Sequence, residues 1–163
     1  GVSKLAGEKY CKMYNEIFGL KTTVLRYFHV YGPNQENDDD LGGVVAIFKK
    51  RAKSGLPIVV HGDGTQQRSF THVDDIVGIN LLVACTDEAN GEAYNCASGV
   101  NVTIKELANA VRKKYDNKID IVYGDSLVGD IKIFDVDNSK IKDLGFEFGI
   151  SFSDGLDDLL GEE

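Results

Sequence analysis

Apolar residues recur along this chain of 163 residues with the period of a helix in some stretches and the period of a strand in others. Between Val2 and Phe18 they are spaced by three and four residues, and Gly19 follows where a helix would need a left-handed cap. Residues 21–33 are instead β-branched and aromatic, and they end at a Gly-Pro pair. These patterns predict a helix followed by one strand.

The same two patterns alternate through the rest of the chain, which predicts an α/β fold. Residues 34–43 are polar and rich in turn formers, so a surface loop is expected there. Further helices are expected over residues 43–55, 74–88, 103–116, 137–145 and 151–163. Further strands are expected over residues 92–98 and 118–125, and two more within 56–73, where they would flank a Gly-Asp-Gly hairpin turn.

Two of the predicted helices begin with residue pairs that suit a capping box. Thr103 is followed three residues later by Glu106, and Ser151 is followed by Asp154. In such a pair the first side chain accepts a hydrogen bond from the backbone N–H of the second residue, which fixes where the helix begins.

The charge of the chain argues against two classes of partner. With 18 Lys and Arg against 26 Asp and Glu, the net charge is −8 at pH 7. The chain therefore lacks the broad basic surface that binding to nucleic acid or to an anionic membrane requires. No apolar run approaches the ~20 residues of a membrane span, and the three scattered cysteines fit reduced thiols. We expect a cytoplasmic protein that binds neither nucleic acid nor membrane.

Familiar signatures of metal and phosphate sites are missing from the sequence. His29, His61 and His72 do not share the spacing of metal ligands, so no metal site is expected. Neither GxGxxG nor GxxxxGK[ST] occurs, so the residues present offer no Rossmann or P-loop turn for a pyrophosphate.

Five short motifs nevertheless occur in the order and spacing of one known family: SKLAGEKYC, LRYFHVYGPNQ, GDGTQQRSFTHVDDIV, YNCASGVNVTIKEL and GDIKIFDVDNSKIKDLGFE. Through them the chain resembles the C-terminal half of an extended short-chain dehydrogenase/reductase of the NAD-dependent epimerase/dehydratase family, with UDP-glucose 4-epimerase as the closest type. The resemblance implies that residues 1–33 are the last helix and strand of the NAD-binding Rossmann domain. Residues 34–163 would form the substrate-binding domain.

The resemblance also implies a catalytic residue and a cofactor, NAD. The family carries Tyr-x-x-x-Lys on a helix, where the lysine lowers the pKa of the tyrosine so that it can deprotonate a sugar hydroxyl. Lys4 matches that lysine, which also binds the nicotinamide ribose, and Tyr27 matches a residue beside the nicotinamide. The tyrosine would precede Gly1, so we expect no turnover from these 163 residues alone. Without the resemblance, Lys4 is an exposed residue near a terminus.

The substrate implied by the resemblance is a nucleotide-diphosphate sugar such as UDP-glucose or UDP-galactose. Phe28 matches a residue that lines the sugar, and His29 stands where the family has a substrate-binding Asn. Arg68 matches an arginine that pairs with the diphosphate, which suits the bidentate geometry of a guanidinium, although a surface ion pair is the alternative. Arg26 is expected to form a structural salt bridge or a hydrogen bond to the backbone rather than a ligand contact.

The remaining matched positions surround the nucleoside. Val59 and His61 match residues that flank the base, and Val44 begins a helix beside the substrate, with ordinary helix packing as the alternative. Two departures affect the diphosphate: a second family arginine is replaced by Leu127, and Ser69 replaces the common Asp after Arg68.

Two functions from different classes remain open on the sequence. The first is the substrate-binding half of an NAD-dependent nucleotide-sugar epimerase, and a 4,6-dehydratase, a decarboxylase or a reductase would share most of the motifs. The second is a non-catalytic module that binds a nucleotide sugar or another protein. Under either function, the apolar face of the first helix and the edge of the strand after it predict self-association.

Overall fold

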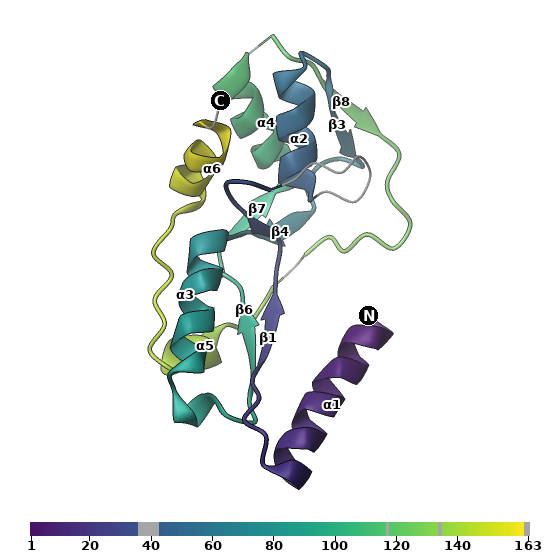
Figure 1. Ribbon diagram of the computed structural model, residues 1–163. Helices are drawn as coiled ribbons and strands as arrows, with labels where there is room; N and C mark the ends of the chain where they lie inside the picture. Colours follow the sequence, from purple (N-terminus) through teal and green to yellow (C-terminus); the bar gives the residue numbers. More distant parts are fainter. Residues whose placement is uncertain (36–42, 117, 134, 162–163) are drawn as a thin grey trace.

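The computed structural model describes residues 1–35, 43–116, 118–133 and 135–161 of the chain (Figure 1). The helices are α1 (Val2–Phe18), α2 (Val44–Lys53), α3 (Val73–Ala84), the short 3₁₀-helix η1 (Asp87–Ala89), α4 (Ile104–Tyr115), α5 (Ser139–Asp143) and α6 (Phe152–Gly161). The strands are β1 (Val24–Tyr27), β2 (Val30–Tyr31), β3 (Ile58–His61), β4 (Gln67–Ser69), β5 (Thr71–His72), β6 (Ala93–Cys96), β7 (Asn101–Thr103) and β8 (Ile121–Gly124). The predicted α/β class is confirmed. Most of the loop predicted over 34–43 lies outside the described residues.

The strands pair in four ladders of two strands each. β1 pairs with β6, β2 with β5 and β3 with β8, all in parallel, whereas β4 and β7 are antiparallel. The hairpin predicted around residues 62–64 is therefore wrong, because β3 and β4 do not pair with each other. The glycine-rich segment between them, in which Gly62 and Gly64 have positive φ, instead carries the chain from one ladder to another.

The single strand predicted over residues 21–33 is divided into β1 and β2. His29 separates the two strands with a φ of +40°, a left-handed conformation that interrupts the pleat. β1 therefore pairs with β6, and β2, beyond the break, pairs with β5.

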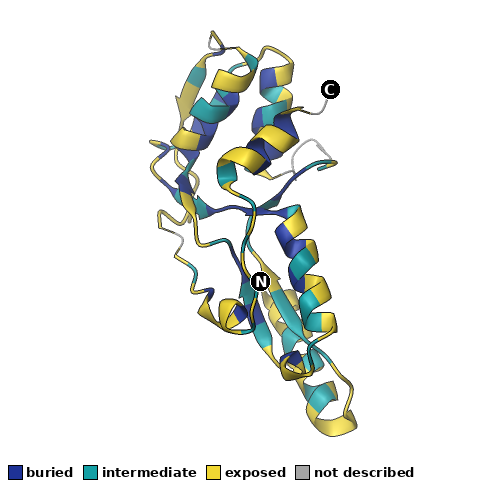
Figure 2. Ribbon diagram, turned by 90° about the vertical axis from the view of Figure 1, so that its left-hand side faces the viewer, coloured by how far each residue is buried: buried dark blue, intermediate teal, exposed yellow. Residues whose placement is uncertain are grey.

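The buried apolar residues form two clusters. The larger packs α2, α4 and α6 around β3, and Ile58, Val60 and Leu107 are among its fully buried members. The smaller packs α3 and α5 against β6. Figure 2 shows buried and exposed residues alternating along these helices, which therefore each direct one face inward. The division of the chain at residue 33 stays a prediction.

Both predicted helix starts are formed. The Thr103 hydroxyl accepts a hydrogen bond from the Glu106 backbone N–H at 3.1 Å, and the Glu106 carboxylate accepts one from the Thr103 backbone N–H at 2.8 Å. At α6 the Ser151 hydroxyl likewise accepts from the Asp154 backbone N–H at 3.1 Å. No helix in the described part of the chain is long and apolar enough to cross a membrane.

Replacing Thr103 by Ala should lower the free energy of unfolding by about 1 kcal/mol, because two backbone N–H groups at the start of α4 lose their partners or their orientation. Thr103→Ser keeps the hydroxyl, so its free energy of unfolding should stay close to that of the unmodified protein. Urea denaturation of the three proteins measures the difference. Equal midpoints for the Ala and Ser variants would show that the capping box does not contribute.

Candidate functional site

A cavity of about 530 Å³ lies between α2 and the segments that follow β3 and β8. Val44, Ile47, Phe48 and Arg51 line it from one face of α2, at the i, i+3, i+4 and i+7 spacing of a helix. The opposite wall comes from Val59 and His61 of β3, Gln66, Arg68 and Ile104, and from Leu127 and Asp130 after β8; His29 completes it. A cavity of this size, mostly apolar and with a few polar groups, is typical of small-molecule sites.

Arg68 is the cationic residue held most tightly in this wall. Its guanidinium forms a short ion pair with Asp130 and donates hydrogen bonds to the backbone carbonyls of Gln67 (2.7 Å) and Ile131 (2.6 Å). The side chain is only 14% exposed, and that of Asp130 is 24% exposed. Asp130 thus provides the orienting carboxylate at Arg68, where Ser69 cannot.

His29 lies close to Arg68 in the same wall. Its burial and the positive charge of Arg68 lower the pKa of its imidazole, partly offset by a hydrogen bond that the ring donates to the Ser69 backbone. The imidazole is therefore neutral at pH 7 and can donate one hydrogen bond and accept another. The left-handed backbone at His29 places this group at the break between β1 and β2, and such strain is frequent at functional sites.

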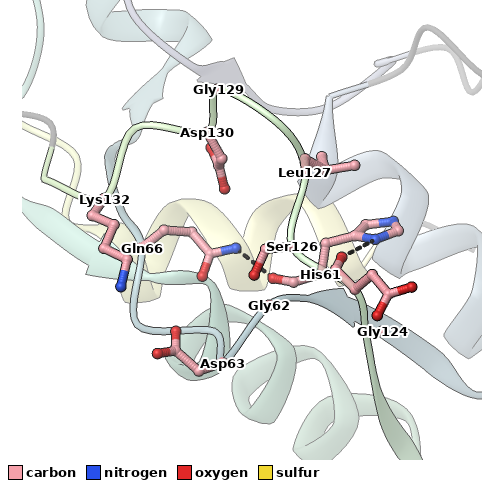
Figure 3. Close-up of a pocket in the computed structure, with 11 residues that line it drawn as sticks. His61, Gly62, Asp63, Gln66, Gly124, Ser126, Leu127, Gly129, Asp130 and Lys132 are labelled. Carbon is pink, nitrogen blue, oxygen red and sulfur yellow. Dashed lines mark hydrogen bonds between the residues drawn. The ribbon is translucent and has the colours of Figure 1, made fainter.

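His61 and Gln66 line both this cavity and a second, more polar one of about 570 Å³, which Figure 3 shows. Gln66 donates a hydrogen bond to the His61 backbone carbonyl at 2.7 Å. His61 Nδ1 lies 3.2 Å from the Asp125 carbonyl, which can only accept, so Nδ1 carries the proton. Asp63 and Lys132 line the far side of the second cavity. The two cavities share His61, Gln66, Leu127 and Asp130 as a common wall.

The structure brings together five of the residues that the sequence assigns to the substrate: His29, Val44, Val59, His61 and Arg68 all line the first cavity. Phe28 does not line it. Lys4 is exposed on α1, and Tyr27 is half-exposed at the end of β1, where its hydroxyl donates to Asn80 at 3.0 Å. The roles of all eight residues stay predictions.

Arg26, in contrast, has the structural role that the sequence suggested. Its guanidinium donates two hydrogen bonds to the Glu8 carboxylate, at 2.9 and 2.7 Å, and so fastens α1 to β1.

Sequence reasoning missed three polar or charged residues of the first cavity, namely Arg51, Gln66 and Asp130. Arg51 is one of four basic residues between positions 49 and 53 of α2, and their sequence does not indicate which of them faces the cavity. The helical phase does provide a signal, because position 51 falls on the same face as Val44, Ile47 and Phe48.

With this geometry in view, the model of the NAD dependent epimerase/dehydratase family matches residues 1–97, more than half of the chain. The chain belongs to this family. An uncharacterised UDP-glucose epimerase of Bacillus subtilis is 31% identical over 160 residues, which are 96% of this chain and 48% of that protein.

Solved structures of the family agree in fold. UDP-glucose 4-epimerase of Thermotoga maritima, solved with UDP-glucose, matches with a TM-score of 0.92 and 33% identity over 99% of this chain and 52% of its own. UDP-glucuronic acid 4-epimerase of Bacillus cereus, solved with UDP-glucuronic acid and NAD, matches with a TM-score of 0.88 and 30% identity over 98% of this chain and 50% of its own. The chain spans about half the length of these relatives.

NAD is the cofactor that the family implies, and the residues present fit only a small part of it. Lys4 and Tyr27 both have exposed side chains that could meet the nicotinamide end. A glycine-rich turn for the pyrophosphate does not occur among these 163 residues. The glycine-rich segment at residues 62–64 joins β3 to β4 beside the second cavity.

Proposed function

We propose that this chain binds a nucleotide-diphosphate sugar, of the UDP-glucose or UDP-galactose type, in the cavity between α2 and β3, as the substrate-binding half of an epimerase. The single observation that carries the proposal is the gathering of His29, Val44, Val59, His61 and Arg68 around one cavity. Arg68 offers a guanidinium for the diphosphate, and Val44 and Val59 offer apolar walls for the nucleoside. Neutral His29, next to Arg68, would face the sugar.

Binding, rather than turnover, is the property we propose for these 163 residues alone. Epimerisation at C4 of the sugar needs hydride transfer to a bound NAD and an acid-base group. Among the residues present, only Lys4 and Tyr27 match family positions beside the cofactor. A dehydratase or a reductase would bind its substrate with the same residues. The residues of this cavity therefore support a class of substrate more than they support one reaction.

Isothermal titration calorimetry with UDP-glucose, UDP and uridine tests the proposal. We expect UDP-glucose and UDP to bind and uridine to bind much more weakly, because uridine offers nothing to Arg68. An assay with added NAD and UDP-glucose or UDP-galactose tests the second part. Equal affinity for uridine and UDP would contradict a diphosphate site at Arg68, and robust epimerisation would contradict binding without turnover.

Self-association with a second copy of the chain is a further expectation, based on α1. None of the residues of α1 is buried, and Val2, Ile17 and Phe18 are each more than 60% exposed. We expect the protein to elute from a sizing column with light-scattering detection as a concentration-dependent dimer or larger species. Ile17→Glu together with Phe18→Glu should shift it to the monomer, whereas Lys12→Glu on the same helix should not. Monomeric elution of the unmodified protein at high concentration would contradict this expectation.

A further inference from the structure

Two arginines, Arg51 and Arg68, line the first cavity. Arg68 matches a family position, whereas the family resemblance assigns no role to Arg51. It lies in the last turn of α2, on the face that lines the cavity, two turns after Val44. Its Nε donates a hydrogen bond to the backbone carbonyl of Pro57, immediately before β3. This bond holds the guanidinium at the end of the cavity where β3 begins.

Arg68 lines the same cavity from the segment beyond the end of β3. β3 runs in parallel with β8, so His61 and Gly124 end the two strands together, and the segment after Gly124 brings Asp130 to Arg68. From Pro57 to His61 an extended chain covers about 13 Å, and from Val44 to Arg51 a helix rises about 10 Å. A ligand with its diphosphate at Arg68 and its sugar at His29 would therefore place its third part, the nucleobase, toward Arg51.

The donors of Arg51 suit a neutral ligand group with exposed acceptors. In the part of the chain that the structure describes, its two terminal nitrogens make no hydrogen bond or ion pair, so they remain available beside the cavity. A guanidinium donates but cannot accept, and its two NH₂ groups form a planar fork. The walls next to it, Ile47, Phe48 and Val59, are apolar and suit the faces of a planar ring.

Resting on the proposed function, we propose that Arg51 selects the nucleobase of the bound nucleotide. It donates hydrogen bonds to a base edge that carries a carbonyl oxygen, as in uracil, thymine or guanine. Cytosine and adenine present an amino group at the corresponding position, so that donor would face donor. The site therefore takes a nucleoside diphosphate with a carbonyl-edged base and disfavours one with an amino-edged base.

UDP and CDP form a matched pair of ligands for the test, because they share ribose and diphosphate and differ at position 4 of the ring. We expect the unmodified protein to bind UDP at least about tenfold more tightly than CDP, the discrimination typical of one good arginine-base contact. Arg51→Gln should reduce this ratio to within about twofold, through loss of affinity for UDP. Its affinity for inorganic pyrophosphate should stay unchanged.

Two more variants control for charge and for packing. Lys53→Gln removes a cation from the same turn of α2, but Lys53 is exposed and does not line the cavity, so it should leave the ratio of UDP to CDP affinity unchanged. Arg51→Lys keeps the charge and a donor for the Pro57 carbonyl but loses the planar fork of two NH₂ groups. Its ratio of UDP to CDP affinity should therefore lie between that of Arg51→Gln and that of the unmodified protein. If Arg51→Gln lowers the melting temperature, Arg51→Lys carries the test.

The other outcomes overturn the inference in distinguishable ways. An unchanged ratio of UDP to CDP affinity in both Arg51 variants would overturn it while leaving the proposed function intact. An equal loss of affinity for UDP, CDP and pyrophosphate would assign Arg51 to the phosphates or to packing. Failure of the unmodified protein to bind either nucleotide or pyrophosphate would overturn the proposed function, and this inference with it.

Discussion

Replacing Arg68 by Gln should weaken the binding of UDP and UDP-glucose by roughly 10- to 100-fold. The guanidinium is mostly buried in the cavity wall, and charge-assisted hydrogen bonds to a phosphate in such a place contribute about 1.5–3 kcal/mol. Loss of the arginine also leaves the Asp130 carboxylate in the wall without its cation, and a negative charge there repels the diphosphate. Calorimetric titration of the variant with UDP measures the change.

Three comparisons isolate the role of Arg68 in that experiment. Arg68→Lys keeps the charge without the bidentate fork and should recover part of the affinity. Arg112→Gln removes an arginine from α4, outside the cavity, and should have no effect on binding. A variant that also lacks the Asp130 charge, Arg68→Gln with Asp130→Asn, should bind more tightly than Arg68→Gln alone. If Arg68→Gln binds UDP as tightly as the unmodified protein, Arg68 is only a structural ion pair.

Local patterns in the sequence predicted the helices and their caps well, because capping depends on residues three positions apart. Thr103 and Glu106 form their capping box as predicted, and Gly19, with a φ of +66°, caps the end of α1. The strand partners could not be read in the same way. Nothing between residues 58 and 69 indicates that β3 pairs with β8, some 60 residues further on, because parallel pairing depends on the whole fold.

The candidate site could likewise be predicted only in part. The family resemblance led to residues at matched positions, and the structure shows that five of them share a cavity. It did not lead to Asp130 as the partner of Arg68, since the two lie 62 positions apart, nor to Arg51, whose position is marked only by helical phase. The break at His29 was missed as well, because the flanking residues of β1 and β2 have uniform strand character and only the backbone conformation separates them.

Gly155 lies where α6 packs against Tyr31 of β2 and His72 of β5. A Cβ atom at position 155 would lie 2.5 Å from Tyr31 Oη and 2.8 Å from His72 Cδ2. Both rings are about 2% exposed and pack edge to face with centroids 5.5 Å apart. Burial, and then the charges of Asp75 and Asp154, raise the pKa of Tyr31, so its hydroxyl stays protonated and donates to the Phe152 carbonyl at 3.4 Å. Neither ring can move without disturbing its neighbours.

Gly155→Ala should therefore lower the free energy of unfolding by about 1–3 kcal/mol, the usual cost of overpacking a filled core. The melting temperature should fall by several degrees, since for a chain of this size each kcal/mol corresponds to about 2–4 °C. Gly7→Ala is the matched control, because Gly7 is also inside a helix but has nothing within 4 Å of an added Cβ. Alanine there should stabilise the protein by up to about 1 kcal/mol through its higher helix propensity.

The opposite signs of these two glycine substitutions separate packing from helix propensity. If helix propensity alone mattered, both variants would melt at a higher temperature than the unmodified protein. That result would show that the close approach of α6 to Tyr31 and His72 does not affect stability. Tyr31 and His72 belong to the β2–β5 ladder, which begins at Val30, directly after His29. A displacement of α6 should therefore also disturb the ligand cavity. We expect Gly155→Ala to weaken UDP binding slightly, and Gly7→Ala to leave it unchanged.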